Sequence, residues 1–204
     1  MSPNKKYVFL VEDDAELRSD LERALQFSGY TVFTFANPEE FWDQFKALAP
    51  AVLVTDMRMP KQSGIELQSE LIAKGNKIPV IFISGESLDE QIVKAFKNGA
   101  FDFLLKPFNR RDFLSAVENA IEQDSIAMQE LIRQDSMIEA LKSLSPRQRQ
   151  VFDLLVKGYG NKELVDALGI SLPTAKEHKS EVMNKLGIRS LAELISLNTE
   201  LTNN

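Results

Sequence analysis

The 204-residue sequence contains no cysteine and only one histidine, His178. Without cysteine the chain can form no disulfide bond or thiolate metal site, and it has no cysteine nucleophile. A single histidine excludes histidine-based metal clusters, and it allows a Ser-His pair only if His178 itself takes part. Any chemistry must therefore depend on carboxylates, lysine and hydroxyl groups.

Long apolar runs are also lacking. Residues 1–6 are polar, and the apolar run at 7–11 is too short for a signal-peptide core or a membrane span. Together with the absence of cysteine, this predicts a cytoplasmic protein. With 44% hydrophobic and 26% charged residues, the composition suits a globular protein of one or two domains.

Net charge is distributed unevenly. Residues 1–108 carry 12 basic and 16 acidic side chains, residues 109–142 carry 4 and 7, and residues 143–204 carry 8 and 7. The C-terminal segment is therefore the least acidic part of the chain. Its net charge of +1 is a weak electrostatic signal for nucleic acid binding.

Five short segments in the first half have the length and composition of buried strands. They are rich in β-branched and aromatic residues, and they occupy residues 7–11, 31–35, 51–55, 79–84 and 101–105. Segments with helical periodicity separate them, and two helix starts are marked by Asn37-Pro38 and by Ser87. This alternation predicts an α/β fold with a doubly wound, five-stranded parallel sheet, whose ligand site lies at the carboxyl ends of the strands.

Residues 110–143 contain neither glycine nor proline, and apolar residues recur there at helical intervals. One long helix is predicted, which at about 1.5 Å per residue would span about 50 Å. Such a helix could serve as a connector or a dimerisation strut. The alternative is a domain helix, a hinge near Asp124-Ser125 and a second, separate helix.

After Leu144 the pattern is helical only. Ser145-Pro146-Arg147-Gln148 is a capping box, Asn161 is expected to cap a second helix, and Ser171 and Ser190 begin two more. The middle two of these helices are joined by a short turn at Gly169-Ile170 and have the dimensions of a helix-turn-helix. The sequence therefore predicts a small all-α domain after the sheet domain.

Polar side chains follow the predicted strands where a parallel sheet would bring them together. Glu12 and Asp13 follow the first strand, Asp56 the third, Ser84 the fourth and Lys106 the fifth. Three carboxylates in one crevice raise one another's pKa unless a cation lies among them. A donor set made only of oxygen atoms predicts a hard divalent ion, Mg2+.

This combination suits phosphoryl transfer onto Asp56, with Lys106 and the metal offsetting charge on the transferring group and Ser84 donating a hydroxyl. The backbone carbonyl of Arg58 could reach the same ion, and Gly64 would allow a close approach of the following helix. A single aspartate after a strand is more often a turn residue or a helix cap. The functional interpretation depends on all these strand ends together.

Four motifs carry a family resemblance: V-E-D-D at 11–14, V-T-D-M-R-M-P-K-Q-S-G at 54–64, I-S-G at 83–85 and K-P-F at 106–108. Residues 5–122 thereby resemble the receiver domain of two-component response regulators. The resemblance implies a flavodoxin-like fold that holds one Mg2+ ion, and a sensor histidine kinase as partner. It implies that Asp56 is the phosphoacceptor, with Glu12 and Asp13 as the acidic metal-binding pair.

The same resemblance implies that Ser84 and Lys106 sense the phosphoryl group. Phe103 falls at the rotating aromatic position of the family, and Lys106-Pro107 falls at its cis peptide bond. Two residues depart mildly from the family pattern, because Glu12 replaces the more usual aspartate and Phe103 lacks the hydroxyl of the tyrosine often found there.

The C-terminal motifs are L-S-P-R-Q-R-Q-V-F at 144–152, N-K-E-L at 161–164 and S-L-P-T-A-K-E-H-K-S-E-V-M-N-K-L-G at 171–187. Residues 141–200 resemble the LuxR-type helix-turn-helix of the FixJ/NarL class. A helix that starts at Ser171 would place its first turns in a DNA major groove. The residues expected near base edges are Lys176, Glu177 and Ser180, and those expected to hold phosphates are Lys162, Thr174 and Lys179.

Alternatives exist for this second domain. The lysines could merely solvate a helical surface, and the low net charge favours that interpretation. The motif favours DNA binding. His178 is expected to pack or to contact phosphate rather than to act in catalysis.

The predicted organisation is a receiver domain over residues 1–122, a helical linker over 123–142 and a DNA-binding domain over 143–204. Phosphorylation of Asp56 would promote homodimerisation and transcriptional regulation at promoter DNA, with RNA polymerase as a further candidate partner and no membrane association. No enzyme activity is expected beyond self-dephosphorylation.

Two other functions remain open. A haloacid-dehalogenase-like hydrolase would need a second aspartate two residues after the nucleophile, and position 58 is arginine. A DNA-binding protein that does not depend on phosphorylation could instead use the first domain only for docking.

Overall fold

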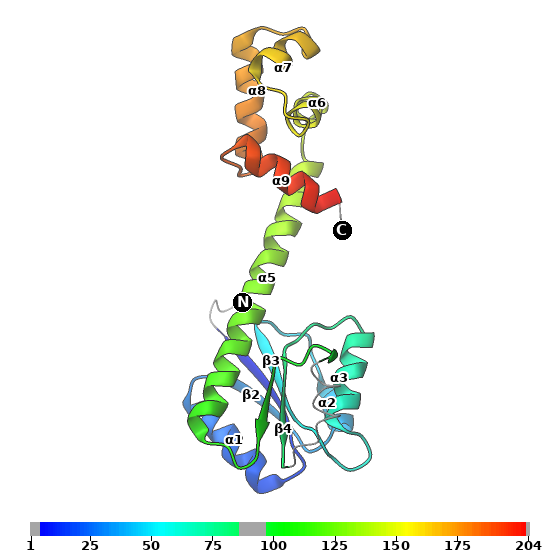
Figure 1. Cartoon of the computed structure of the whole chain (residues 1–204), viewed down its shortest axis with the longest axis vertical. Helices are drawn as coiled ribbons and strands as arrows, with labels where there is room; N and C mark the ends of the chain where they lie inside the picture. Colours follow the sequence, from blue (N-terminus) through cyan, green and yellow to red (C-terminus); the bar gives the residue numbers. More distant parts are fainter. Residues whose placement is uncertain (1–4, 86–96, 203–204) are drawn as a thin grey trace. The chain divides into compact units, whose positions relative to one another are not determined.

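A computed structural model of the chain describes the backbone of residues 5–85 and 97–202, with side chains described as far as residue 196 (Figure 1). The chain divides into two compact units, Met1–Glu130 and Leu131–Asn204. Within the described residues, no helix combines the length and the apolar character needed to cross a membrane. The helix predicted to begin at Ser87 lies outside the described residues.

The first unit contains a five-stranded parallel sheet. Its strands are β1 (Tyr7–Val11), β2 (Thr31–Phe35), β3 (Ala51–Asp56), β4 (Val80–Ser84) and β5 (Asp102–Leu105), in the spatial order β2-β1-β3-β4-β5. Each strand lies within a residue or two of its predicted position, and the predicted fold class is confirmed. The buried central strands β1, β3 and β4 are nearly continuous apolar runs, as expected for a sheet covered on both faces.

Helices cover both faces of this sheet. They are α1 (Ala15–Phe27), α2 (Pro38–Gln44), α3 (Gly64–Ala73) and α5 (Arg110–Lys142). One apolar cluster joins the sheet to α1 and α5, and a second joins its other face to α2 and α3. Figure 1 shows these helices beside the sheet. The layers place the carboxyl ends of the strands at one edge, where the loops are free to carry polar residues.

The helix α5 runs from Arg110 to Lys142 without interruption. The hinge considered near Asp124-Ser125 is absent, because both residues are helical. Asp124 instead has a specific partner, since its Oδ2 accepts a hydrogen bond of 2.8 Å from the backbone amide of Ala51 at the start of β3. This contact fixes the helix to the sheet at the position of the hinge alternative.

The second unit packs four further helices and the end of α5 around one core. These helices are α6 (Pro146–Leu155), α7 (Asn161–Leu168), α8 (Leu172–Lys185) and α9 (Leu191–Thr202). The capping box at Ser145 and the cap at Ser171 are present as predicted. The prediction of Asn161 as a cap was wrong. Gly160 is the cap residue, because the Glu163 carboxylate accepts its amide at 3.0 Å and Asn161 begins the helix.

Candidate functional site

An acidic cluster lies at the carboxyl edge of the sheet. Glu12 and Asp13 follow β1, Asp56 ends β3, and one oxygen atom from each of the three carboxylates lies within 4.8 Å of the others. Glu12 and Asp56 are buried, whereas Asp13 is exposed to solvent. The fold therefore brings together the three carboxylates that the sequence placed at separate strand ends.

Lys106 connects two members of this cluster. Its Nζ donates to Asp56 Oδ2 at 2.5 Å and to Glu12 Oε2 at 3.0 Å. Burial lowers the pKa of Lys106, but the hydrogen bonds to Asp56 and Glu12 outweigh burial, so the pKa lies above its usual value. Lys106 thus stays cationic and partly neutralises two carboxylates that would otherwise repel each other.

Glu12 is the most deeply buried carboxylate of the cluster, with 1% of its surface exposed. Burial raises its pKa above the usual value, and the hydrogen bond from Lys106 offsets only part of that rise. A buried carboxylate with a raised pKa gains from a nearby cation, because the added positive charge favours its ionised form.

Both carboxylate oxygens of Asp56 have hydrogen-bond partners. Lys106 donates to Oδ2, and the backbone amide of Arg58 donates to Oδ1 at 2.7 Å. The following residue is also fixed, because the Met57 amide donates to the Ile83 carbonyl at 2.8 Å. These contacts hold the Asp56 side chain in one direction at the end of β3.

The glycine eight residues after Asp56 has a clear structural role. A Cβ atom on Gly64 would lie 2.3 Å from the backbone oxygen of Asp56, far closer than atoms can approach. The Gly64 amide donates to the Met57 carbonyl at 3.2 Å, and Ser63 caps α3 with a capping box. Glycine is therefore required for α3 to begin so close to the acidic cluster.

Ser84 and Phe103 lie on the two neighbouring strands. Ser84 ends β4, is almost fully buried, and its carbonyl accepts the Lys106 amide at 2.7 Å. Phe103 pairs with Phe82 across β4 and β5 and is half-buried against the cluster that packs on α2 and α3. The Lys106-Pro107 peptide bond is cis, as the resemblance implied.

The donor set fits a hard divalent cation. All three converging groups are carboxylates, Asp13 opens to solvent, and nothing in the cluster supplies nitrogen or sulfur ligands. The backbone carbonyl of Arg58 is the further ligand that the sequence predicts. The amide of the same residue donates to Asp56, so Arg58 lies beside the cluster.

In the second unit, α7 and α8 form the predicted helix pair. Lys162, Lys176, Glu177 and Ser180 are exposed, and Thr174 and Lys179 are half-buried. Within the described part of the chain, no hydrogen bond or ion pair engages the side chains of the three lysines, so their charges are available to a ligand. The Thr174 hydroxyl lies 2.8 Å from the Ser171 hydroxyl, within the helix cap.

His178 has a partner on its own helix. Its Nδ1 lies 3.3 Å from Glu181 Oε2, and the Gln148 side chain of α6 donates to the same carboxylate at 3.3 Å. The hydrogen bond from His178 lowers the pKa of Glu181. Gln148 and Glu181 therefore link α6 to α8, and His178 contacts the α8 member of that pair.

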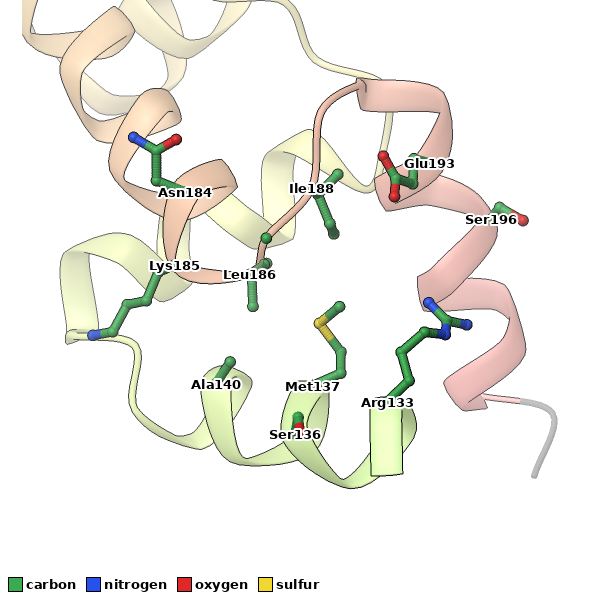
Figure 2. Close-up of a pocket in the computed structure, with 11 residues that line it drawn as sticks. Arg133, Ser136, Met137, Ala140, Asn184, Lys185, Leu186, Ile188, Glu193 and Ser196 are labelled. Atoms are coloured by element: carbon green, nitrogen blue, oxygen red, sulfur yellow. The ribbon is translucent and has the colours of Figure 1, made fainter. Parts of the chain in front are cut away.

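A pocket of about 670 Å3 lies elsewhere in the second unit (Figure 2). Met137 and Ala140 of α5, Leu186 after α8 and Ile188 form its apolar wall, and Glu193 and Ser196 of α9 lie at its rim. It involves the C-terminal end of α8, whereas the predicted DNA contacts lie on α7 and earlier in α8, and none of them lines the pocket. The pocket is thus separate from the predicted DNA-contacting residues.

One residue that contacts the acidic loop, which connects β1 to α1 and contains Glu12 and Asp13, was not predicted from the sequence. The Arg18 guanidinium donates to the backbone carbonyls of Glu12 and Asp13 from the second turn of α1. The only signal in the sequence is a basic residue five positions after Asp13, which is too common a pattern to identify a contact.

Two family models match the chain. Residues 8–118 match the response regulator receiver domain, and residues 142–198 match the bacterial regulatory proteins of the luxR family. Together these matches cover the sheet domain and the helical domain in turn.

Full-length proteins are similar over nearly the whole chain. The transcriptional regulatory protein TdiR of Thauera aromatica is 33% identical over 94% of this chain and 85% of its own length. FixJ of Bradyrhizobium diazoefficiens is 34% identical over 95% of this chain and 94% of its own length.

Two solved structures extend this similarity to the fold. The response regulator StyR is 37% identical with a TM-score of 0.80, over 97% of this chain and 100% of that chain. Full-length FixJ from B. japonicum is 32% identical with a TM-score of 0.60, over 97% of this chain and 98% of that chain.

Proposed function

The chain belongs to the response regulators that join a receiver domain to a LuxR-type DNA-binding domain, and we propose that Asp56 is the residue whose phosphorylation controls it. Proteins with this pair of domains regulate transcription in response to phosphorylation by a histidine kinase. The observation that carries the proposal is the pair of hydrogen bonds on Asp56, from Lys106 on one oxygen and Arg58 on the other.

Asp56 acts as the nucleophile. One of its carboxylate oxygens attacks the phosphorus of a phosphohistidine on the kinase. A P–O bond forms as the P–N bond breaks, and the electron pair of that bond stays on the imidazole nitrogen. Lys106, kept cationic by its raised pKa, moves from the Asp56 carboxylate to the oxygens of the transferred group. The Ser84 hydroxyl donates a hydrogen bond to the same group.

Receiver domains bind Mg2+ at acidic residues, and we infer one such ion here. The carboxylates of Glu12, Asp13 and Asp56 and the backbone carbonyl of Arg58 would hold it. When bound, Mg2+ supplies positive charge that offsets the negative charge on the phosphoryl oxygens. The fit of an all-oxygen donor set with one solvent-exposed member supports this assignment.

The signal passes from Ser84 to Phe103 and then to the surface near residues 87–108, part of which lies outside the described residues. Movement of Ser84 toward the phosphoryl group lets Phe103 rotate, and two receivers then pair. The burial of Ser84 and the partial burial of Phe103 on adjacent strands support this route. Pairing holds two DNA-binding domains at high effective concentration on promoter DNA.

On DNA, Lys176, Glu177 and Ser180 read base edges, and a second set of residues holds phosphates: Lys162, Thr174 and Lys179. The exposure of Lys162, Lys176 and Glu177 supports their access to DNA. We propose RNA polymerase as a further partner, because a domain bound to promoter DNA would lie close to it.

Intact-mass spectrometry after incubation with acetyl phosphate and Mg2+ tests the central proposal. We expect one phosphoryl increment on the wild-type chain, none on Asp56→Asn, and none when the metal is chelated. Asp43→Asn is the matched control, because Asp43 is an exposed aspartate on α2 and should leave the increment unchanged. An increment that persists on Asp56→Asn would contradict the assignment of Asp56.

The same samples separate the alternative functions. We infer that the chain does no catalysis beyond slow loss of its own phosphoryl group. Turnover of a phosphate ester such as p-nitrophenyl phosphate would instead support a hydrolase. Absence of any increment, combined with tight DNA binding, would support a docking role for the receiver domain.

A further inference from the structure

Arg18 lies in the second turn of α1 and reaches back to the acidic loop that connects β1 to α1. Its guanidinium Nη1 donates to the carbonyl of Glu12 and, at 3.3 Å, to the carbonyl of Asp13. Its backbone amide donates to the carbonyl of Asp14 at 2.9 Å. A single residue therefore holds three consecutive carbonyl groups of the loop.

The contact with Asp13 is the most consequential of these. Glu12 has other partners, because its amide donates to the Phe35 carbonyl at 3.1 Å and Lys106 donates to its carboxylate at 3.0 Å. Among residues 5–85 and 97–196, Arg18 is the one hydrogen-bond donor to Asp13. Without Arg18, the backbone that directs the exposed Asp13 carboxylate would lose this restraint.

A guanidinium that binds the backbone of Glu12 and Asp13 has two opposing effects on a cation site formed by their carboxylates. Its positive charge repels a divalent cation, which weakens binding. Its hydrogen bonds fix the backbone from which the Glu12 and Asp13 carboxylates project, which lowers the ordering cost of binding. Because Arg18 donates to backbone carbonyl oxygens, Arg18 itself occupies neither the Glu12 nor the Asp13 carboxylate.

We propose that Arg18 is a positioning residue for the acidic cluster. It orders the backbone of Glu12 and Asp13 so that their carboxylates and that of Asp56 converge before Mg2+ binds. The proposal rests on the Mg2+-dependent phosphorylation of Asp56 proposed above, and it adds a residue that contacts neither the cation nor the phosphoryl group. Residues that orient metal ligands in this way commonly have a large effect on metal affinity.

The two effects of Arg18 predict opposite changes in Mg2+ affinity when Arg18 is replaced. A measurement of that affinity therefore decides between them. Calorimetric titration of the full chain with MgCl2 should show about tenfold weaker binding for Arg18→Met. Arg18→Lys keeps the charge, but its ammonium nitrogen lies one bond nearer the backbone than the Nη1 that makes both hydrogen bonds, and we expect binding about threefold weaker than wild type. Arg23→Met is the matched control, because Arg23 is an exposed arginine of the same helix that pairs with Asp20. It should bind Mg2+ as the wild type does.

Phosphorylation by acetyl phosphate, measured against Mg2+ concentration, gives a second readout. For Arg18→Met, the Mg2+ concentration at half-maximal rate should rise about tenfold, while the rate at saturating Mg2+ returns close to that of the wild type. A role limited to general stability would lower the rate at every Mg2+ concentration. Melting of each variant in EDTA checks that it is folded, and Arg18→Lys decides the question if Arg18→Met does not fold.

Unchanged or tighter Mg2+ binding by Arg18→Met would overturn the proposal, and tighter binding would mean that charge repulsion is the larger effect. A wild-type chain that binds no Mg2+ would overturn the proposed metal site itself. The two failures are therefore distinguishable within one set of titrations.

Discussion

The position of Asp56 depends on Gly64, because the first turn of α3 passes directly over the backbone oxygen of Asp56. The Gly64 amide also donates to the Met57 carbonyl, and this hydrogen bond joins the two ends of the loop between β3 and α3. No side chain fits at this approach, and the acidic cluster is compact for that reason. The chemistry proposed for Asp56 thus depends on the absence of a Cβ atom at residue 64.

Gly64→Ala should lower the free energy of unfolding by about 2 kcal/mol, because the added methyl group forces the backbone apart. Phosphorylation by acetyl phosphate should slow in parallel, since Asp56 moves with the loop. Urea denaturation and intact-mass time courses measure the two effects. Gly85→Ala is the stability control, because a Cβ there meets no atom of the described residues within 4 Å. Equal stabilities of the two variants would contradict the role of Gly64.

At the scale of elements, α5 is held to the sheet by a contact as well as by apolar packing. Phe113, Val117 and Ile121 bury one stripe of the helix in the core, and Asp124 then accepts the amide of Ala51. Burial raises the pKa of Asp124 above its usual value, and the hydrogen bond from Ala51 lowers it by less. Ionisation of the Asp124 carboxylate therefore costs more free energy in the folded protein than in the unfolded chain.

The sign of the pH dependence follows from this raised pKa. As pH rises from the unfolded value of 3.8, the unfolded chain releases the Asp124 proton first, so stability falls until the folded pKa is passed. Asp124→Asn keeps an acceptor for the Ala51 amide without the charge. We expect it to match the wild type at the acidic end of this window and to be at least as stable above it.

Urea denaturation of wild type, Asp124→Asn and Asp124→Ala across that window tests the expectation. Asp124→Ala removes the acceptor from the buried Ala51 amide and should be less stable than Asp124→Asn by about 1 kcal/mol. A wild type that is more stable than Asp124→Asn at neutral pH would show that the charged hydrogen bond outweighs the cost of burial.

At the scale of the whole molecule, we expect the low positive charge to limit DNA binding by a single copy. The chain has a net charge of -6, and residues 143–204 contribute only +1. Affinity for DNA depends strongly on the number of phosphates neutralised. Two paired copies double the phosphate contacts without any change in the domain itself.

Phosphorylation should therefore convert a monomer into a dimer and raise DNA affinity by about a hundredfold. Sedimentation measures the first change, and fluorescence anisotropy on DNA selected from a random-sequence library measures the second. The salt dependence of binding should steepen as the phosphate contacts double. Asp56→Asn is the control. If it dimerised and gained affinity on treatment with acetyl phosphate, phosphorylation of Asp56 could not be the cause.

Much of the site could be predicted because its members follow apolar strands in the sequence. A parallel sheet brings strand ends to one edge, so the strand pattern alone was enough to predict that Glu12, Asp13 and Asp56 meet. The contacts that orient them could not be predicted. The hydrogen bond from the Arg58 amide to Asp56 was not predicted beside the role expected for the Arg58 carbonyl, and nothing in the local pattern identified Arg18.

The sequence by itself determined the order of strands and helices, the caps at Ser145 and Ser171, and the set of polar residues at the strand ends, because these depend on local periodicity and local hydrogen bonding. Only the tertiary structure decided that α5 continues through Asp124, because the partner of Asp124 lies 73 residues away at Ala51. It also decided the bridge from Lys106 to Glu12 and Asp56, which joins residues 94 and 50 positions apart. Partners at such separations are selected by packing of the whole sheet domain, and no local pattern encodes them.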